Sequence, residues 1–384
     1  MSAAEMRTAI GVISGTSMDG IDVALIRSDG EARVEAGPAE TFPYPEAISR
    51  ALRAVVADVT QAEKPQAELE GAVTQAHVAA VEAFLGRFGV ARESVAVVGL
   101  HGQTILHRPR ARLTRQLMDG ARAAEALGID VVCDFRAADV AAGGEGAPLA
   151  PVYHAAMAAK LERPLMVLNW GGVGNVTYLG ANGEIVAFDT GPANALLDDF
   201  CLRRRGVAFD ADGALAASGR ADAGALADML RDAYFDRPPP KSLDRNHFAA
   251  AAARVESLSD ADGAATLSAF TVEATARALV HVPEAPRRWL VGGGGRRNRV
   301  LMRRLTERLG VKVEPVEAIG FDGDAIEAQC FAYLALRSLK GLPISYPTTT
   351  GAPEPMRGGV FWPAHAKGPR LREARAVRTG LRPR

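Results

Sequence analysis

The sequence predicts an α/β protein built from two similar halves. Residues 10–26 and residues 166–180 each read as a strand, a glycine-containing turn and a second strand, because apolar and β-branched runs flank glycine clusters. A third strand, helices and further strands follow in both halves, and 384 residues are enough for two domains. We therefore predict duplicated α/β domains that face each other across a cleft, each with a hairpin able to bind phosphate.

The first half begins with three strands, and Pro43 and Pro45 then break the strand pattern. Ala/Glu-rich segments with helical spacing follow. A short continuous apolar run at 95–100 is typical of a strand that is buried on both faces. The expected strands are 7–14, 20–27, 32–42, 95–100 and 130–134, and the expected helices are 46–58, 64–88 and 119–127.

The second half repeats this plan and ends in a long helix. Helices dominate from 192 to 280, where a proline-rich loop at 237–240 interrupts them. We predict a first domain over 1–150 and a second over 151–364, with about 325–363 packing back on the first, and a flexible basic tail over 365–384. The expected strands are 165–170, 176–179, 184–188, 288–291 and 311–315, and the later helices are expected from Asn298 and over 323–340.

The composition indicates a soluble cytoplasmic protein. Hydrophobic residues make up 48% of the chain and charged residues 23%, the formal net charge is zero, and aromatic residues are 6%. These values give no reason to expect nucleic acid or a membrane as a partner. No apolar run reaches the length of a membrane span, and no signal-peptide pattern is present. The widely spaced Cys133, Cys201 and Cys330 favour reduced thiols, and no zinc-type spacing occurs.

The turn of the first hairpin offers backbone N–H groups and hydroxyls for anionic oxygens. Beside them, the carboxylates of Asp19 and Asp22 suit a hydrated divalent cation. An ordinary hairpin turn uses the same residue types, so these residues alone leave both interpretations open. The turn and its flanks comprise Gly15, Thr16, Ser17, Met18, Asp19, Gly20, Ile21 and Asp22.

Two further glycine clusters are candidate ligand contacts. The glycines at 171–174 open into another strand, whereas a dinucleotide-binding fingerprint opens into a helix, so a nicotinamide site is disfavoured. The P-loop pattern is absent. Gly292–Gly295 lie between a strand and a helix, where glycine lets the backbone approach a ligand and a helix N-terminus favours anions. The alternative for this cluster is a loose strand–helix connection.

Polar residues follow several of the predicted strands, where open α/β sheets usually bind ligands. Asp189 could deprotonate a hydroxyl or a water, or cap the next helix, and the two roles are compatible. His101 is expected to contact the substrate without transferring protons, and Arg136 could hold a carboxylate through two N–H groups. Glu327, near the start of the last long helix, has a solvated surface role as its default.

Together these motifs resemble those of the anhydro-N-acetylmuramic acid kinases, within the superfamily of sugar kinases, actin and the heat-shock chaperone ATPases. The resemblance covers about residues 8–363, with the motifs in order. It implies two ribonuclease-H-like domains of the actin-like ATPase fold with an interdomain cleft. The motifs are SGTSMDGIDVAL at 14–25, GLHGQT at 99–104, DFR at 134–136, NWGGVGNVT at 169–177, FDTGPAN at 188–194, GGGGRRN at 292–298 and TGAPEPMRGGVFWP at 350–363.

The resemblance also implies a reaction. ATP phosphorylates O6 of 1,6-anhydro-N-acetylmuramic acid while water opens the 1,6-anhydro bridge, in the recycling of cell-wall peptidoglycan. Asp189 is then the general base, Glu327 assists near the sugar, and domain closure excludes stray water. Mg²⁺ is held by Asp19 or Asp22. The other implied contacts are His101, Gln103 and Arg136 for the sugar, residues 15–22 with Gly171, Gly172, Gly174 and Asn175 for the phosphates, and Gly292, Gly293, Gly294, Gly295 and Asn298 for the adenosine.

Other expectations concern assembly and alternatives. Family members form homodimers, and the same is expected here. The chain departs from the usual NIGGIAN pattern of the family at Trp170 and Gly174. Two rival functions stay open: a kinase for another sugar, and a non-metabolic ATPase of actin or chaperone type, which would turn over ATP without sugar and without dependence on Arg136 or His101.

Overall fold

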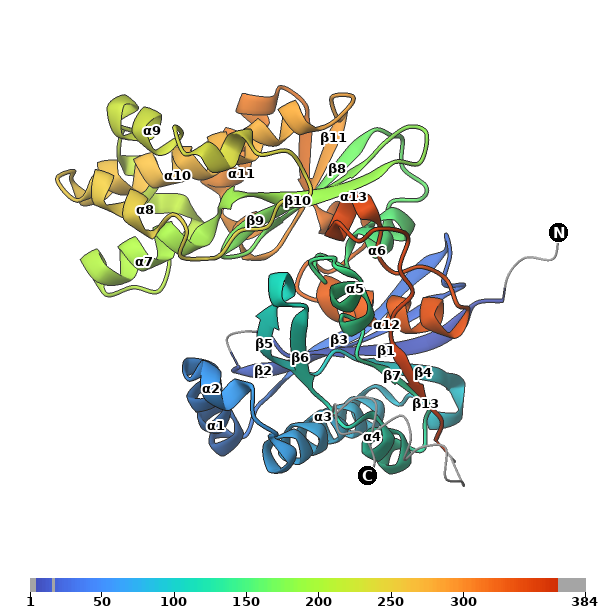
Figure 1. The fold of residues 1–384 in the computed structure, drawn as a ribbon. Coiled ribbons are helices and arrows are strands. Elements are labelled where there is room, and N and C mark those ends of the chain that lie inside the picture. Colours follow the sequence, from blue (N-terminus) through green and yellow to red (C-terminus); the bar gives the residue numbers. More distant parts are fainter. Residues whose placement is uncertain (1–4, 16–17, 365–384) are drawn as a thin grey trace. The chain divides into compact units, whose positions relative to one another are not determined.

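The structure is a computed structural model, and it describes residues 5–15 and 18–364. The chain divides into two compact units (Figure 1). The first unit comprises residues 1–146, 327–345 and 352 onward, and the second comprises residues 147–326 and 346–351. Among the described residues, no helix is both long and apolar enough to cross a membrane.

The first unit is built on a six-stranded mixed sheet. On one side of the sheet, β1, β2 and β3 pair antiparallel. On the other side of β1, β4 and then β7 run parallel to it. The last strand pairs antiparallel with β7 and forms an edge. The order across the sheet is β13 (Val360–Trp362), β7 (Val131–Cys133), β4 (Val95–Leu100), β1 (Arg7–Ile13), β2 (Gly20–Ser28) and β3 (Val34–Pro43).

Helices cover both faces of this sheet (Figure 1). Ile10 and Val12 of β1 point into a core that also holds Phe84 of α3 and Leu127 of α4. Gly11, between them, points to the other face, where α12 lies. A small hairpin and short helices complete the unit. The helices are α1 (Glu46–Ala57), α2 (Val59–Ala62), α3 (Ala67–Phe88), α4 (Gly120–Leu127), α5 (Ala137–Ala142) and α12 (Ile326–Leu339), and the hairpin is β5 (Gln103–Arg108) with β6 (Leu113–Leu117).

The glycines of the first sheet explain how closely α12 packs. A Cβ added at Gly11 would lie 1.9 Å from the carbonyl oxygen of Ala328, and one at Gly99 would lie 2.2 Å from that of Phe331. Real Cβ atoms do not approach a carbonyl oxygen so closely, so only glycine allows α12 to rest directly on β1 and β4. This packing fixes the first turn of α12 beside the carboxyl ends of these strands.

The second unit repeats the strand order of the first. Its five strands again comprise three antiparallel strands followed by two parallel ones. Trp170 and Trp289 are fully buried in the core along this sheet. The order is β10 (Ile185–Pro192), β9 (Val173–Leu179), β8 (Leu165–Trp170), β11 (Arg288–Gly292) and β12 (Lys312–Pro315).

A separate helical core extends the second unit. Phe200 of α7, Ala216 of α8 and Phe270 of α10 contribute fully buried side chains to it. Ser259 caps α10 by accepting a hydrogen bond from the Asp262 N–H, and several helices end at left-handed glycines. The helices are α6 (Pro151–Met157), α7 (Asn194–Arg205), α8 (Ala214–Ser218), α9 (Ala223–Met229), α10 (Asp260–Ala276), α11 (Arg299–Leu309) and α13 (Pro347–Thr350).

The predicted α/β class is confirmed, since both units carry the same mixed strand order. Two local predictions were wrong, and one hairpin was missed. Gly174 and Asn175 lie within β9 and not in a turn, and the β5–β6 hairpin was not predicted. Asp189 does not cap the next helix: β10 continues to Pro192 and α7 begins only at Asn194, without a side-chain cap. Pairing with β9 stabilises this strand extension, and local turn propensity could not show that pairing.

Candidate active site

Met18, which precedes β2, has an uncommon backbone conformation. Thr16 and Ser17 lie outside the described residues. Met18 has a positive φ of 56°, and its N–H donates to the Gly15 carbonyl at 3.2 Å. Ser49 of α1 donates its hydroxyl to the Met18 carbonyl. A positive φ costs energy for a non-glycine residue, and these two hydrogen bonds support the conformation of Met18.

Two carboxylates stand at the start of β2. Asp19 is exposed, whereas Asp22 is half-buried and accepts a hydrogen bond from the Thr41 hydroxyl at 2.6 Å. Gly20 and Ile21, between them, are buried. In the described part of the chain, no cluster of three or more His, Cys, Asp or Glu could hold a metal ion. A pair of carboxylates completed by water and phosphate oxygens is a common donor set for Mg²⁺, so the pair fits a nucleotide-bound ion.

His101 and Arg136 meet beside the carboxyl ends of β4 and β7. Arg136 Nε donates to His101 Nε2 at 3.0 Å, and His101 Nδ1 donates to the Gly102 carbonyl at 2.9 Å. His101 is buried, and burial together with the guanidinium charge lowers the pKa of its imidazole well below the usual value. His101 is therefore a neutral ring whose two nitrogens are both used within the protein.

Arg136 keeps part of its guanidinium available. Besides its bond to His101, it donates from Nη1 to the Gly146 carbonyl at 2.7 Å. Burial lowers the pKa of Arg136, and the nearby Cys330, Glu327 and Asp139 oppose this effect. The described residues supply no hydrogen-bond partner for Nη2. Because a guanidinium has five N–H donors, Arg136 can still hold a ligand carboxylate.

Gln103 connects β5 to the turn of the first hairpin. Its Nε2 donates to the Gly15 carbonyl at 3.2 Å. Its Oε1 is buried and has no hydrogen-bond partner among the described residues. Most buried polar atoms are paired, so this oxygen is a candidate acceptor for a ligand hydroxyl or amide.

Glu327 lies in the first turn of α12, where it interacts electrostatically with Arg136 and Asp22. Its side chain is exposed, yet the surrounding protein desolvates it, and this raises the pKa of the carboxyl group. The Arg136 charge opposes that effect and the Asp22 charge adds to it. One turn later on α12, the Phe331 ring lies 4.6 Å from the His101 ring, centroid to centroid. Glu327 therefore lies near residues that follow β4 and β7 and near the start of β2.

Asp189 lies on β10, the edge strand of the second sheet, and three contacts fix it. Its N–H donates to the Lys241 carbonyl at 3.0 Å, and its carbonyl accepts from the Tyr234 hydroxyl at 2.7 Å. Its Oδ2 accepts from the Leu243 N–H at 2.8 Å. The described residues offer no hydrogen bond to Oδ1. One carboxylate oxygen is therefore held while the other is left for a water or a hydroxyl.

The protonation of Asp189 is tuned to neutral pH. Burial raises the pKa of its carboxyl group to about 7, while the Leu243 N–H acts in the opposite direction. A base works best when its pKa lies near the operating pH, because it is then both deprotonated and basic enough to take a proton. Among acidic groups, such a shift at a sheet edge marks a candidate catalytic residue.

The β8–β9 hairpin rests against the start of α7. Asn194 Nδ2 donates to the carbonyls of Trp170 and Gly171 at 2.8 and 2.9 Å, and the Gly172 carbonyl accepts from the N–H of residue 193 at 3.0 Å. The carbonyl groups of the turn are thus satisfied by the protein itself. Trp170 also donates from its indole to Thr275 at 3.0 Å in the core, so this departure from the family pattern serves packing.

Gly174 and Asn175 continue into β9. A Cβ added at Gly174 would lie 2.7 Å from the Thr190 hydroxyl, so glycine is needed there for contact with β10. Asn175 pairs with Asp189 across the two antiparallel strands. The second glycine motif and Asp189 are therefore neighbours in one sheet.

The four glycines after β11 differ in how closely neighbouring atoms pack against them. Gly293 has a positive φ of 72°, and Cβ atoms added at Gly293 and Gly295 would lie 2.4 and 2.6 Å from side-chain atoms of β8. Cβ atoms at Gly292 and Gly294 would meet nothing closer than 3.6 and 3.9 Å. Two of the four glycines are thus required for packing, whereas a Cβ at either of the other two would make only ordinary van der Waals contacts.

The loop after these glycines is pinned by side chains. Arg296 donates to the Gly293 carbonyl at 2.9 Å, to Glu317 at 2.8 Å and to Asp324 at 3.0 Å. Asn298 caps α11, because its Oδ1 accepts from the N–H groups of residues 300 and 301 at 3.1 and 3.0 Å. Asn298 therefore shapes the helix start, and only its Nδ2 is left for a ligand.

Sequence motifs did not reveal three residues around Asp189: Tyr234, Lys241 and Leu243. They flank the proline-rich loop at 237–240, which was interpreted only as a helix interruption. Lys241 is only 6% exposed, which is rare for a lysine. The sequence signal available for it was its position directly after three prolines.

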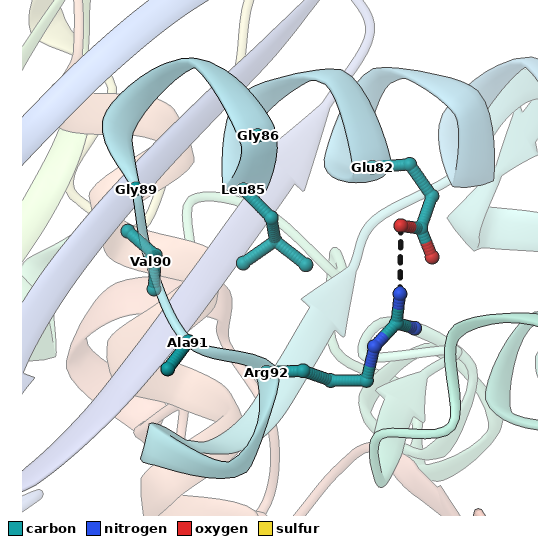
Figure 2. Close-up of a pocket in the computed structure, with 7 residues that line it drawn as sticks. All are labelled: Glu82, Leu85, Gly86, Gly89, Val90, Ala91 and Arg92. Carbon is teal, nitrogen blue, oxygen red and sulfur yellow. Dashed lines mark hydrogen bonds and ion pairs between the residues drawn. The ribbon is translucent and has the colours of Figure 1, made fainter.

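A surface pocket at the C-terminal end of α3 is not a candidate site (Figure 2). Its walls are Leu85, Gly86 and the residues after α3, and the Glu82–Arg92 ion pair at 2.8 Å crosses it. This pair leaves no charge for a ligand, and none of the residues discussed above lines the pocket.

Comparisons with known proteins cover nearly the whole chain. A model of the family described as anhydro-N-acetylmuramic acid kinase matches residues 7–364. The enzyme of that name from Rhodospirillum rubrum is 56% identical over 358 residues, 93% of this chain and 94% of the relative. The enzyme of that name from Nitrobacter winogradskyi is 51% identical over 364 residues, which are 92% of this chain and 99% of the relative. A solved ROK family glucokinase from Streptomyces griseus, in complex with glucose and AMPPNP, is 15% identical with a TM-score of 0.39, covering 86% of this chain and 99% of that one.

The matched region ends just before the basic segment 365–384, which lies outside the described residues.

Proposed function

The chain belongs to the anhydro-N-acetylmuramic acid kinase family, and we propose that it uses ATP to phosphorylate 1,6-anhydro-N-acetylmuramic acid while water opens the 1,6-anhydro bridge. The products are N-acetylmuramic acid 6-phosphate and ADP. The observation that carries the mechanism is the setting of Asp189, a carboxylate with one oxygen held by a backbone N–H and a pKa raised to about 7. A base with this pKa can activate water at neutral pH.

The proposed steps balance without a further acid. Asp189 takes a proton from water as the water oxygen bonds to C1 of the sugar, and the C1–O6 bond breaks. O6 then bonds to the γ-phosphorus of ATP, and ADP leaves. Phosphorylation quenches the negative charge that develops on O6, which a separate acid would otherwise have to do. Glu327 is proposed to assist near the sugar.

The first unit is proposed to recognise the sugar through Arg136. Its free Nη2 and remaining N–H donors suit the lactyl carboxylate of the substrate. His101 uses both ring nitrogens within the protein, so its proposed role is to orient Arg136. The unpaired Oε1 of Gln103 is proposed to accept from a sugar hydroxyl or amide.

Nucleotide contacts are proposed on both units. In the first unit, residues 15–22 would contact the phosphates, and Asp19 and Asp22 would hold Mg²⁺ directly or through water. In the second unit, Gly171, Gly172, Gly174 and Asn175 would contact phosphate, and Gly292–Gly295 with Asn298 would line the adenosine. Mg²⁺ would neutralise charge on the β- and γ-phosphate oxygens. At Gly294 an added Cβ would meet a single atom within 4 Å, at 3.9 Å, and this supports the adenosine assignment.

The function is tested by ADP release with one sugar at a time. We expect turnover with 1,6-anhydro-N-acetylmuramic acid and little or none with N-acetylmuramic acid or glucose. In ¹⁸O-labelled water the label should appear at C1 of the product. Equal turnover with glucose would support a kinase for another sugar, ATP turnover without sugar would support a non-metabolic ATPase, and phosphorylation without label at C1 would refute the mechanism.

The cellular setting is part of the proposal. We expect a cytoplasmic enzyme of peptidoglycan recycling, because ATP is available there, and a homodimer by resemblance to the family. Sedimentation of the purified protein at micromolar concentration checks the dimer, and a monomer at all concentrations would contradict it.

A further inference from the structure

The segment from Tyr234 to Leu243 lies beside Asp189 at the edge of the second sheet. β10 is the edge strand, so the outward N–H and carbonyl groups of Asp189 have no strand beside them. The segment supplies their partners instead, through the Lys241 carbonyl and the Tyr234 hydroxyl, and the Leu243 N–H reaches the carboxylate. The position of the Asp189 side chain therefore depends on how this segment is held.

The buried side chain of Lys241 makes hydrogen bonds within this segment. Its Nζ donates to the carbonyls of Tyr234 and Phe235 at 3.1 and 3.2 Å, and it lies 3.1 Å from His281 Nε2. The ammonium also lies 4.7 Å from the centroid of the Tyr234 ring. The two carbonyl groups use two of the three N–H donors of the lysine, while His281 Nε2 itself donates to the Phe235 carbonyl at 2.9 Å. The Lys241 side chain is almost fully buried. Lys241 thus ties both ends of the segment together.

A buried ammonium at this place is not needed to fill the core. A methionine has a similar length and would occupy the same space without the cost of removing a charge from water. It would remove the hydrogen bonds from residue 241 to the two carbonyl groups, which would keep only the Arg237 N–H and His281 Nε2 as donors. What lysine provides here, and methionine does not, is a pair of hydrogen bonds that join residues 234 and 235 to residue 241, two positions before the Leu243 N–H.

We propose that Lys241 is a positioning residue for the general base: its ammonium fixes the segment 234–243 so that the Leu243 N–H holds Oδ2 of Asp189 and leaves Oδ1 directed at the attacking water. This proposal rests on the proposed function of Asp189. Lys241 does not contact the carboxylate, and its action passes through the backbone of the segment.

Kinetics of Lys241→Met test the proposal. We expect kcat to fall by about ten- to a hundredfold, because a displaced base loses much of its catalytic effect, while KM for ATP and for the sugar changes less than about twofold. Lys312→Met, an exposed lysine of the same unit, is the matched control and should behave as the unchanged protein. An unchanged kcat in Lys241→Met, or a parallel change of kcat and both KM values, overturns the proposal.

The Asp189→Asn background separates positioning from general damage. If Lys241 acts through Asp189, Lys241→Met should cause no further loss of turnover once the base is gone. A further loss by the same factor as in the unmutated background overturns the proposal. If Lys241→Met fails to fold, Tyr234→Phe replaces it. This variant removes one hydroxyl from the same segment, and its turnover is again compared with and without Asp189→Asn.

A measurement that does not depend on enzymatic activity tests the positioning role whatever the substrate is. Amide hydrogen exchange at Leu243 should accelerate at least about tenfold in Lys241→Met, while exchange in β8 stays unchanged. If the unmutated protein does not phosphorylate the anhydro-sugar but Leu243 exchange responds as expected, the proposed function fails and the positioning role stands. Unchanged exchange at Leu243 refutes the positioning role whatever the substrate.

Discussion

The surroundings of Asp189 decide its chemistry more than its motif does. An aspartate at a strand end is a frequent feature, but a carboxylate whose pKa burial raises to about 7 and whose Oδ2 is held by a backbone N–H is not. His101 shows the opposite outcome. Burial lowers its pKa well below the usual value, and both its nitrogens make hydrogen bonds within the protein, which suits an orienting role.

Replacing Asp189 by Asn tests the base. We expect turnover to fall by at least about a hundredfold, because an amide cannot accept the proton of water, while binding of ATP and sugar persists. Calorimetric titration with each ligand checks binding, and a coupled assay checks turnover. Near-normal turnover in this variant would reject the assignment.

The raised pKa of Asp189 also predicts how stability depends on pH. Because the pKa is about 7 in the folded protein and 3.8 for an ordinary aspartate, as in the unfolded chain, the folded protein favours the protonated form. The stabilisation is complete below pH about 4 and is lost as pH rises towards 7. The unfolding free energy of Asp189→Asn minus that of the unmutated protein should therefore grow from pH 5 to pH 7 and then level off. Urea unfolding at four pH values measures it, and a flat difference would contradict the shift.

Arg136→Ala tests the carboxylate contact. We expect KM for the sugar to rise at least about tenfold, since a charge-assisted hydrogen bond is lost, with a smaller effect on KM for ATP. Arg110, exposed in the same unit, provides the control Arg110→Ala. Equal effects of Arg136→Ala on the two KM values would remove its role as a carboxylate clamp.

At the scale of elements, the packing of α12 on the first sheet brings Glu327 to the strand ends. Gly11 and Gly99 make this approach possible, and Gly99 is also the first residue of the GLHGQT motif. In the second unit, Gly293 and Gly295 play the same part for the loop after β11. In the glycine cluster that the sequence predicted as a ligand contact, some glycines are therefore required for packing and others are not.

A pair of glycine substitutions tests the packing of α12. Gly99→Ala should lower the unfolding free energy by about 1–3 kcal/mol, because the added Cβ would lie 2.2 Å from the Phe331 carbonyl oxygen. Gly86→Ala in α3, where a Cβ meets nothing within 4 Å, should instead raise it by about 0.5–1 kcal/mol. Thermal and urea unfolding measure both. A Gly99→Ala protein as stable as the unmutated one would show that α12 can shift.

At the scale of the whole molecule, each unit reaches the same strand order with different residues. Three antiparallel strands precede two parallel ones in both, although the two sequences share only the pattern of strand, glycine turn and strand. Each unit also has its own buried core. Hydrophobic patterning therefore suffices to specify this sheet in two sequence contexts.

Removing residues 365–384 tests whether the basic segment takes part in the reaction. The family match ends at residue 364, so we expect kcat and both KM values to stay within about twofold and the melting temperature to stay within about 2 °C. A larger loss of activity would give this segment a role of its own.

The sequence by itself determined the α/β class, most of the strands and helices, and the motifs that carry the proposed chemistry. Alternating and continuous apolar runs follow directly from which faces of a strand are buried, so patterns such as 95–100 could be recognised without the fold. The same holds for Asp189 as a candidate base. Boundaries near prolines and glycines were less well predicted, because pairing with a neighbouring strand overrode local propensity at β9 and β10.

Only the tertiary structure decided how these residues act. The pKa of Asp189 depends on burial and on the Leu243 N–H, 54 positions away in the chain. The link between Arg136 and His101 spans 35 positions, and the approach of α12 to β1 depends on a glycine more than 300 residues earlier. Desolvation and hydrogen bonding act through space, and a sequence pattern records neither until the sheet brings the strands together.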